Sequence, residues 1–491
     1  MASTFHGIEV SKSGLYAQQA AMNTAGHNIA NANTPGYSRQ RVHLTTNMPL
    51  EMPSLQQGVY AGQLGTGVNA AEIGRMRDEF LDLQFRQESS RLGEWELRSN
   101  TLDKLEALFN EPGDSGLRTV LNQFWASWQD LSRDPHSMTA RTVVIQRGIA
   151  VAEAFNHTAE QLANLTADTD VSLGVKVEEV NAYLRQIGAL NKQIAGIEAA
   201  GQDANDLSDQ RDHLVDQISR LLNIEVTPSG AGYALAVGGA MLVSADGGTV
   251  NELSLSGDPA NGYAIEAPAA GVTLYDASVD LIASGELRGI LESLWTVQSY
   301  RDGLDQMVQR LVNDVDGINV THQGGFDMYG AGGGLLFTAV GDPSVKAASA
   351  SDIQFNAAIA SDPRLIAAAG HATAFQGDGD NALAIAQLRH RLLDQDGDPL
   401  TADAMTMDDH FRSQMGRLGV DSQEARRYHD NQQVLVSQVD YLRQSVMGVS
   451  LDEEMANLVK FQNAYNAAAR VLTTMDEALE KLINGTGIVG R

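Results

Sequence analysis

The sequence predicts a mainly α-helical protein with β-rich insertions: an elongated multi-domain subunit with paired N- and C-terminal coiled-coil helices and a helical-bundle stalk. Three observations predict this fold class. Apolar residues recur about every 3.5 positions at both chain ends, long internal segments have helical periodicity, and two internal segments combine alternating apolar residues with Gly-rich turns. The length of 491 residues exceeds one hydrophobic core, so about two to four domains are expected.

The first expected element is an amphipathic helix followed by a tight turn. Its narrow apolar stripe consists of residues spaced by seven, Ile8, Leu15, Met22 and Ile29. Such a stripe needs a partner helix. The helix should end near Asn33, because the residue before a proline avoids the α region, and Pro35-Gly36 suits the central positions of a type II turn.

A second helix of this kind is expected at the C-terminal end. Ser450 and Glu453 have the spacing of a capping box, so the helix should begin there. The apolar stripe that we expect at the assembly interface consists of Leu451, Met455, Leu458, Tyr465, Leu472, Leu479 and Ile483. Because isolated helices of this length are marginal in water, we expect the two ends to pair with each other, and with neighbouring subunits, only upon assembly.

Both ends carry sequence signatures of a known family. Residues 26–31 (GHNIAN) and 33–39 (NTPGYSR) resemble the N-terminal signature of bacterial flagellar rod, hook and hook-associated axial proteins. Residues 445–458 (SVMGVSLDEEMANL) resemble the C-terminal signature of the hook-associated family at the hook–filament junction. The residues of the signature turn are Asn28, Asn31, Asn33, Thr34, Pro35, Gly36 and Tyr37.

This resemblance implies a structural, non-enzymatic subunit that leaves the cell through the flagellar export channel without a cleaved signal and functions outside the cell. It implies as partners copies of the chain in a tubular ring, the hook subunit below, and a second junction protein or the filament above. An export chaperone is implied on the C-terminal helix. The alternatives are a hook or rod axial subunit of the same family, or a flagellar scaffold with hydrolase or adhesin activity in its insertions.

Composition restricts the partners further. The formal net charge of -28 argues against a nucleic-acid backbone or an anionic membrane surface. The chain has no cysteine, which excludes disulfides, thiolate metal sites and cysteine nucleophiles. The first residues lack the pattern of a signal peptide, and no apolar run is long enough for a transmembrane helix.

The pattern also divides the chain into domains. The segments are 1–41, the N-terminal coiled-coil helix and Pro-Gly turn, which pairs with 450–491; 42–74, an extended linker; 75–223 with 284–322 and 403–449, the helical stalk; 224–283, a small β-rich insertion; 323–402, a second, mixed α/β outer insertion; and 450–491, the C-terminal assembly helix. Within the stalk, separate helices are expected at 138–166, 168–200 and 205–223.

No catalytic, cofactor-binding or metal-binding site is predicted. The residues Asp206, Asp209, Asp212 and Asp216 share one face of the helix at 205–223, and we interpret them as a solvated acidic face rather than a metal site. The run 394–398 begins like a calcium-binding loop, but Pro399 stands where glycine is needed and Met405 where glutamate belongs. His27 is expected to form a hydrogen bond at the helix exit, and Asn31 and Asn33 are expected to cap the helix end and form the turn, rather than to act in catalysis.

Overall fold

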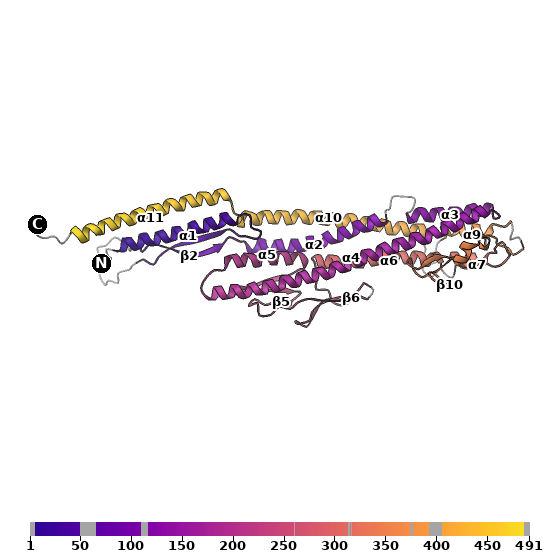
Figure 1. Cartoon of the computed structure of the whole chain (residues 1–491), viewed down its shortest axis with the longest axis horizontal. Helices are drawn as coiled ribbons and strands as arrows, with labels where there is room; N and C mark the ends of the chain where they lie inside the picture. Colours follow the sequence, from indigo (N-terminus) through magenta and orange to yellow (C-terminus); the bar gives the residue numbers. More distant parts are fainter. Residues whose placement is uncertain are drawn as a thin grey trace.

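The protein is elongated, and both termini lie at the same end (Figure 1). The structure, a computed structural model, describes residues 5–49, 65–109, 116–259, 261–312, 315, 317–373, 377–391 and 405–485. Long helices run parallel to the long axis, and the small sheets lie beside them or at the end opposite to the termini. Within the described residues, no helix is both long and apolar enough to cross a membrane.

The terminal end is built from two helices and a hairpin. Helix α1 (His6–Asn31) packs against α11 (Leu451–Gly485), and strands β1 (Gln40–Thr46) and β2 (Val68–Arg75) pair antiparallel beside α1. The predicted helices are confirmed, and α11 begins at Leu451 with the Glu453 amide donating to Ser450 Oγ at 3.5 Å. The capping box is only half formed, because the Glu453 carboxylate accepts from Arg39 at 2.8 Å. The expected linker at 42–74 supplies most of this hairpin.

The stalk is a bundle of α2 (Glu79–Phe109), α4 (Met138–Ala199), α5 (Asn205–Leu221), α6 (Glu286–Val312) and α10 (Met407–Met447). The prediction of separate helices at 138–166 and 168–200 is wrong, because α4 is one helix of 62 residues, about 90 Å long. No proline interrupts it, and the hydroxyls of Thr166 and Thr169 bond carbonyls four residues back, so they do not cap a new helix.

The first insertion folds into two small antiparallel sheets against α4. The described residues of this segment form strands β3 (Glu225–Ser229), β4 (Gly232–Val237) and β5 (Ala240–Val243) in one sheet, and β6 (Ser254–Asp258), β7 (Gly262–Ala267) and β8 (Val272–Tyr275) in the other. Alternate side chains such as Leu235, Val237 and Ile265 are buried, which confirms the alternation read from the sequence.

The outer end combines helices with a third small sheet. It contains α3 (Leu117–Arg133), α7 (Ile318–Gly324), α8 (Ala357–Ser361), α9 (Asp380–Gln387), the 3₁₀ turns η1 (Pro363–Leu365) and η2 (Leu388–His390), and strands β9 (Phe337–Ala339), β10 (Asp342–Lys346) and β11 (Ile353–Phe355). Strand β9 lies between β10 and β11, and the sheet packs on α4 through β11.

The described residues form two hydrophobic cores, and two helices belong to both. Helix α4 contributes Phe155 to the outer core and Leu184 to the core under the first insertion, and α6 contributes Val308 and Leu291 in the same way. These continuous helices make the stalk one rigid body. Neither core, as far as the described residues define them, includes a residue of α1 or α11.

A buried histidine holds the outer end together. His322 is fully buried; its Nδ1 lies 2.7 Å from the Gly334 carbonyl, and its Nε2 accepts from the Ala367 amide at 2.9 Å. This pair of bonds requires the neutral ring protonated on Nδ1. Burial, together with the nearby Arg141 cation, lowers the pKa of His322 to about 4, against the opposing effects of the Gly334 bond and Asp327.

We therefore expect the outer end to lose stability as the pH falls below about 6.5, where histidine in the unfolded chain becomes protonated but folded His322 does not. The loss should reach about 3 kcal/mol near pH 4, at about 1.4 kcal/mol per pKa unit. Amide hydrogen exchange at Ala367 measures this loss of stability.

His322→Asn should flatten the pH dependence of the stability. His371→Asn, which alters an exposed histidine, should retain it. If the pH dependence of His322→Asn is unchanged, groups other than His322 cause it.

Candidate assembly interface

The two terminal helices pack antiparallel through small residues of α1. A Cβ atom at Gly7 would lie 2.9 Å from Met475 Cε, and one at Gly14 would lie 3.8 Å from Ala468 Cβ. The most buried side chains of α1 are also small or polar: Ser11, Ala17, Ala21, Thr24, Ala25 and Asn28. The backbone of α1 therefore approaches its neighbours closely, while the larger apolar side chains lie beside this face.

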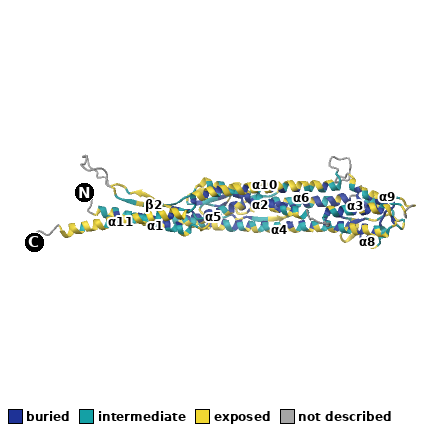
Figure 2. Ribbon diagram, turned by 90° about the horizontal axis from the view of Figure 1, so that it is seen from above, coloured by how far each residue is buried: buried dark blue, intermediate teal, exposed yellow. Residues whose placement is uncertain are grey.

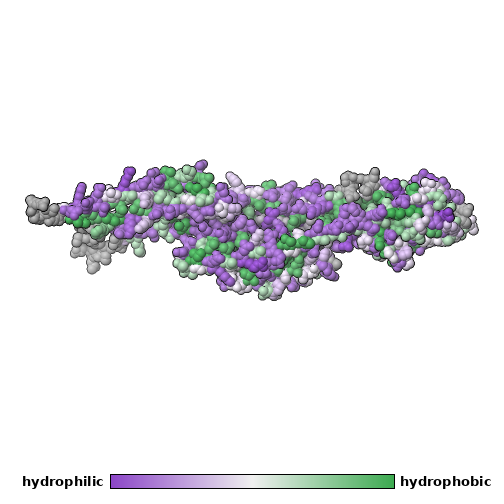
Figure 3. All heavy atoms as spheres, in the orientation of Figure 1, coloured by the Kyte–Doolittle hydropathy of each residue, from purple (hydrophilic) through white to green (hydrophobic). Residues whose placement is uncertain are grey.

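The structure brings together part of the predicted apolar stripes. The half-buried members of the two stripes are Ile8, Leu15, Met22, Ile29, Leu458, Tyr465, Leu472 and Leu479. By contrast, Leu451 is 49% exposed, Met455 61% and Ile483 72%. Much of α11 is exposed in Figure 2, and apolar residues reach the surface along the terminal end in Figure 3. A single chain thus leaves apolar surface of its terminal helices uncovered.

The signature turn has the predicted conformation and sits on the stalk. The Tyr37 amide donates to the Thr34 carbonyl at 3.2 Å, and Gly36 has φ +78, which defines a type II turn over Pro35-Gly36. A Cβ atom at Gly36 would lie only 2.7 Å from His213 Cβ on α5. Glycine is therefore required both by the backbone conformation and by the close approach.

Asn28 fixes the path of the chain between α1 and β1. Its side chain is buried; Oδ1 accepts from the Gln40 amide at 2.9 Å and from the Tyr37 hydroxyl at 2.8 Å, and Nδ2 donates to the Gln40 carbonyl at 2.9 Å. Burial, with the nearby Asp206 carboxylate, raises the pKa of Tyr37, so its hydroxyl stays protonated and donates. One buried amide therefore closes the loop around the turn.

The other polar signature residues act at the helix exit, as predicted for His27 and Asn31. His27 Nε2 lies 3.2 Å from Asp206 Oδ1 on α5, and Asn31 Nδ2 donates to the His27 carbonyl at 3.1 Å. The Thr34 hydroxyl donates to Asn31 Oδ1 at 3.2 Å. Asn33 is exposed in the turn.

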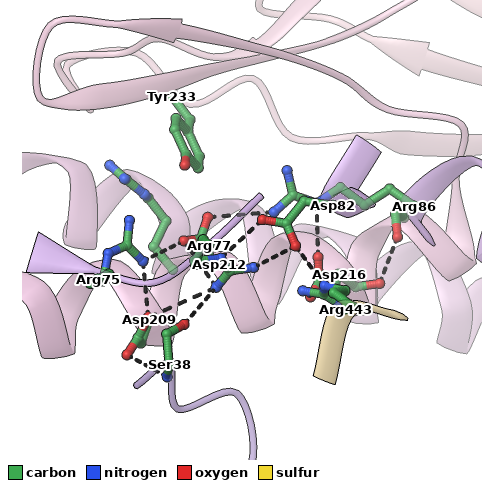
Figure 4. Close-up of polar contacts among 12 residues, drawn as sticks. Ser38, Arg75, Arg77, Asp82, Arg86, Asp209, Asp212, Asp216, Tyr233 and Arg443 are labelled. Carbon is green, nitrogen blue, oxygen red and sulfur yellow. Dashed lines mark hydrogen bonds and ion pairs between the residues drawn. The ribbon is translucent and has the colours of Figure 1, made fainter. Parts of the chain in front are cut away.

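A buried cluster of charges joins the terminal end to the stalk, and we call it the Arg–Asp cluster (Figure 4). Its members are Arg75, Arg77, Arg86, Arg443, Asp82, Asp209, Asp212 and Asp216. The interpretation of the acidic face of α5 as solvated is wrong for three of its four residues: the side chains of Asp209, Asp212 and Asp216 are only 5%, 1% and 12% exposed. Asp206, at 56%, is the solvated one.

Each arginine of the cluster connects carboxylates. Arg77 binds both oxygens of Asp82, at 2.9 and 3.0 Å. Arg75 Nη1 donates to Asp209 at 2.9 Å and to Asp212 at 2.6 Å.

The remaining two arginines come from α2 and α10. Arg86 donates to Asp216 at 2.8 Å and lies 3.4 Å from Asp212, while Arg443 contacts Asp82 and Asp216. The end of β2 with the residues after it, α2, α5 and α10 therefore meet at one point.

The charges of the cluster balance, four positive against four negative. Burial acts to raise the pKa of Asp212, but Arg77, Arg75 and Arg86 outweigh it, so the net effect is a lowered pKa. Asp82 is held below its usual pKa in the same way, by Arg77 and Arg443 against burial. Burial raises the pKa of Asp209 despite hydrogen bonds from Ser38 and Arg75.

A neighbouring arginine ties the turn to the start of α11. Arg39 contacts Glu453 at 2.8 Å and the buried Glu454 at 2.7 Å, and its amide donates to the Met447 carbonyl at 2.9 Å. The break between α10 and α11 is thus held against the turn. None of these residue pairs was predicted from the sequence, although the opposite charges of Arg75, Arg77 and the acidic face of α5 were a usable signal.

The described part of the chain contains one group of side chains spaced for a metal ion, His371, Asp378 and Asp380, with ligand atoms within 4.8 Å of one another. The Asp378 carboxylate already accepts from the amides of Gly370, His371 and Asp380, so it closes a loop. The calcium-like run 394–398 lies outside the described residues.

Comparisons with known proteins agree with this architecture. Residues 102–337 match the family model of the flagellar hook-associated protein FlgK helical domain, residues 441–485 that of the flagellar basal body rod FlgEFG protein C-terminal region, and residues 8–37 that of the flagella basal body rod protein. The paired ends and the stalk therefore define a flagellar axial protein.

Similarity over the full chain shows which flagellar axial proteins this chain resembles. The chain is 35% identical to flagellar hook-associated protein 1 of Bacillus subtilis (strain 168) over the whole of both chains, and 25% identical to that of Escherichia coli (strain K12) over 97% of this chain and 99% of the other. The chain belongs to the flagellar hook-associated protein 1 family. The solved flagellar hook junction protein FlgK from Burkholderia pseudomallei has the same fold, with a TM-score of 0.61 at 15% identity, over 74% of this chain and all of that one.

We expect Asp212→Asn to lower the free energy of unfolding of the stalk by about 3–5 kcal/mol, because it leaves buried arginines without their counter-charge. Urea denaturation followed by circular dichroism measures this loss. Asp203→Asn is the matched control: it removes an exposed carboxylate just before α5 and should change the stability by less than about 0.5 kcal/mol. Equal losses in both variants would contradict a balanced buried cluster.

We expect Gly36→Ala to destabilise the joint between turn and stalk for two separable reasons. Positive φ costs a non-glycine residue about 1–2 kcal/mol, and the added Cβ meets His213. In a double-mutant cycle with His213→Gly, which removes the contacting Cβ, only the steric part should be recovered. If the second substitution restores all of the lost stability, the positive φ at residue 36 has no cost. If it restores none of the lost stability, the contact with His213 has no cost.

Proposed function

We infer that this chain is a structural subunit of the bacterial flagellar hook–filament junction and that it assembles with copies of itself through its terminal helices. The proposed assembly mechanism rests on one observation. The helices α1 and α11 contribute nothing to the two cores of the described residues, yet they retain exposed apolar side chains such as Met455 and Ile483. Surface of this kind is stabilised by burial against neighbouring subunits.

The proposed partners follow from the family. Copies of the chain form a tubular ring, the hook subunit lies below it, and a second junction protein or the filament lies above. The relatives are named hook-associated, and the solved neighbour is titled a hook junction protein, which supports this arrangement. In such a wall the stalk is the rigid body, and the terminal helices supply the contacts.

Export completes the proposal. The chain passes unfolded through the flagellar export channel, is held beforehand by a chaperone on α11, and functions outside the cell. The exposed apolar residues of α11 suit a chaperone that covers them before assembly. The absence of cysteine is compatible with passage through a narrow channel.

In a single chain α1 and α11 already form helices that pack on each other, contrary to the expectation that they pair only upon assembly, so assembly has to offset only the freedom that they still lose there. Fixing a residue costs about 1–2 kcal/mol, whereas full burial of a large apolar side chain contributes about 1.5–3 kcal/mol. The half-buried stripe residues of a single chain gain the rest of this contribution when a neighbour covers them. Residues at the centre of the stripe therefore matter most.

The alternatives have less support. A hook or rod subunit shares the two terminal signatures, but the full-length similarity is to hook-associated protein 1. A hydrolase in the insertions has no support from a motif or from a constellation of described side chains. We propose no enzymatic activity and no cofactor.

Electron microscopy of flagella from cells without this gene tests the junction role, with the growth medium analysed alongside. We expect hooks that end bare and filament subunits lost to the medium. Intact filaments on the deletion strain would reject the proposed function.

We expect Leu472→Asp to abolish incorporation while leaving the thermal transition of the monomer nearly unchanged. Leu472 lies on the half-buried side of α11, and the cores that set the transition lie in the stalk. Thermal unfolding by circular dichroism and incorporation in complemented cells are the two measurements.

Thr473→Asp is the matched control, because it adds the same charge at an exposed neighbouring position. It should incorporate normally. A large drop in the monomer's thermal transition with Leu472→Asp would instead mean that the terminal pair is part of the folded core.

A further inference from the structure

One side of α10 presents apolar residues to solvent in the half of the helix nearest the terminal end. We call the exposed residues Val434, Leu435, Tyr441 and Leu442 the α10 patch. Every exposed residue of α10 between 431 and 445 is uncharged, although the whole chain has a formal net charge of -28. The centres of protein–protein interfaces are depleted in charged side chains in the same way. The α10 patch therefore suits a protein partner.

A second exposed apolar surface lies near the start of α2. Phe80 is 70% exposed and Leu83 is 46% exposed, and we call these two residues the α2 patch. They are three positions apart, so they lie on one side of the helix. Neither belongs to the two hydrophobic cores of the described residues, so the fold of a single chain does not account for them.

The two patches lie at the same position along the long axis of the stalk. Arg443 of α10 contacts Asp82 of α2, and each of these residues is adjacent in sequence to a patch residue. Arg426, earlier in α10, contacts Asp103, later in α2, so the two helices run antiparallel (Figure 1). The contact between Arg443 and Asp82 therefore marks the level of both patches.

The two patches face opposite sides of this pair of helices. The step from Asp82 to Leu83 and the step from Arg443 to Leu442 both lead towards the outer end of the stalk. Each step turns the side chain by about 100° in the same rotational sense. Because Asp82 and Arg443 point towards each other, Leu83 and Leu442 lie on opposite sides of the pair. Both leucines are exposed, as residues at the two flanks of a helix pair should be.

Two apolar patches at one level and on opposite sides suit a repeated contact between copies of the chain. When copies stand side by side in one orientation, the α10 patch of each copy faces the α2 patch of the next. Such a heterologous contact forms a ring where its rotation closes. The negative charge of each copy opposes close approach, so uncharged apolar surfaces are the ones that can meet without repulsion.

We propose that a second copy of this chain covers the α10 patch with its α2 patch, and that this contact joins neighbouring stalks. Phe80 and Leu83 of one copy pack against Tyr441 and Leu442 of the next, and Val434 lies beside them. The inference rests on the proposed assembly of copies. It adds to that assembly a lateral contact made by the stalk, separate from the contacts of the terminal helices.

Paired cysteine substitutions test this contact, because the chain has no cysteine of its own. Flagella of cells that carry Leu83→Cys and Leu442→Cys in one chain are treated with a short bismaleimide crosslinker and then denatured. We expect a ladder of crosslinked dimers, trimers and larger multimers. Each single variant should give no multimer, since a heterologous contact does not bring the same residue of two copies together.

Leu83→Cys combined with Val171→Cys is the matched control, because Val171 is also exposed but lies on α4, outside both patches. This pair should give no ladder. Absence of the ladder from the test pair, in flagella whose filaments are intact, overturns the proposed contact and leaves the junction role standing. Dimers from either single variant, or an equal ladder from the control pair, overturn it as well.

Tyr441→Asp tests the same contact without a crosslinker. It should lower incorporation into flagella at least tenfold, because assembly would bury a carboxylate against an apolar surface. The thermal transition of the monomer should be nearly unchanged, since this side chain is 74% exposed.

Gln433→Asp is the control for this variant. It adds the same charge at an exposed residue on the opposite side of α10 from Leu442, about two and a half turns earlier, and it should incorporate normally. Normal incorporation of Tyr441→Asp overturns the proposed contact. An equal loss of incorporation in both variants also overturns it, because the loss would then follow from added charge anywhere on α10.

Discussion

The arrangement of this molecule depends on eight charges buried where the terminal end meets the stalk. Removing an ion from water costs several kcal/mol, so Asp212 and Arg77 are tolerated there only because each finds its counter-charges at hydrogen-bonding distance. The partners come from β2 and the residues after it, α2, α5 and α10, segments that are far apart in the sequence (Figure 4). A shifted arrangement leaves charges buried without partners. An apolar contact tolerates small rotations, whereas the bidentate Arg77–Asp82 pair fixes an orientation.

This fixed joint separates two regions held together in different ways. The stalk has two hydrophobic cores linked by the continuous helices α4 and α6, so it behaves as one strut. The terminal helices instead contact each other where Gly7 and Gly14 of α1 approach α11, and they leave much of α11 exposed (Figure 2). A rigid stalk with weakly buried ends suits a subunit whose ends complete their burial in an assembly. The turn at Pro35-Gly36 transmits the position of the ends to the stalk through Gly36 and His213.

Much of the fold could be predicted because its signals are local. The 3.5-residue period at both ends, the alternation in the first insertion and the capping box at Ser450 each depend on neighbouring residues. The break expected in α4 and the overlooked small face of α1 both depend on packing between segments, which neighbouring residues do not show. Helix α4 continues through the expected break near residue 167 because packing on two cores stabilises both halves. The small face of α1 was overlooked because Gly7 and Gly14 give no apolar signal, although close backbone packing requires them.

The amino-acid sequence alone was enough to predict where α1 ends, where α11 begins and the bounds of α5 to within a few residues, together with the type II turn and the family signatures, since backbone conformation and capping follow from adjacent side chains. Which charges are buried depends on tertiary packing. Asp206 and Asp209 look equivalent along α5, yet one is solvated and the other lies under Ser38 and Arg75. Charge pairing depends on segments brought together by folding, and a single chain read in order carries no direct signal of that proximity.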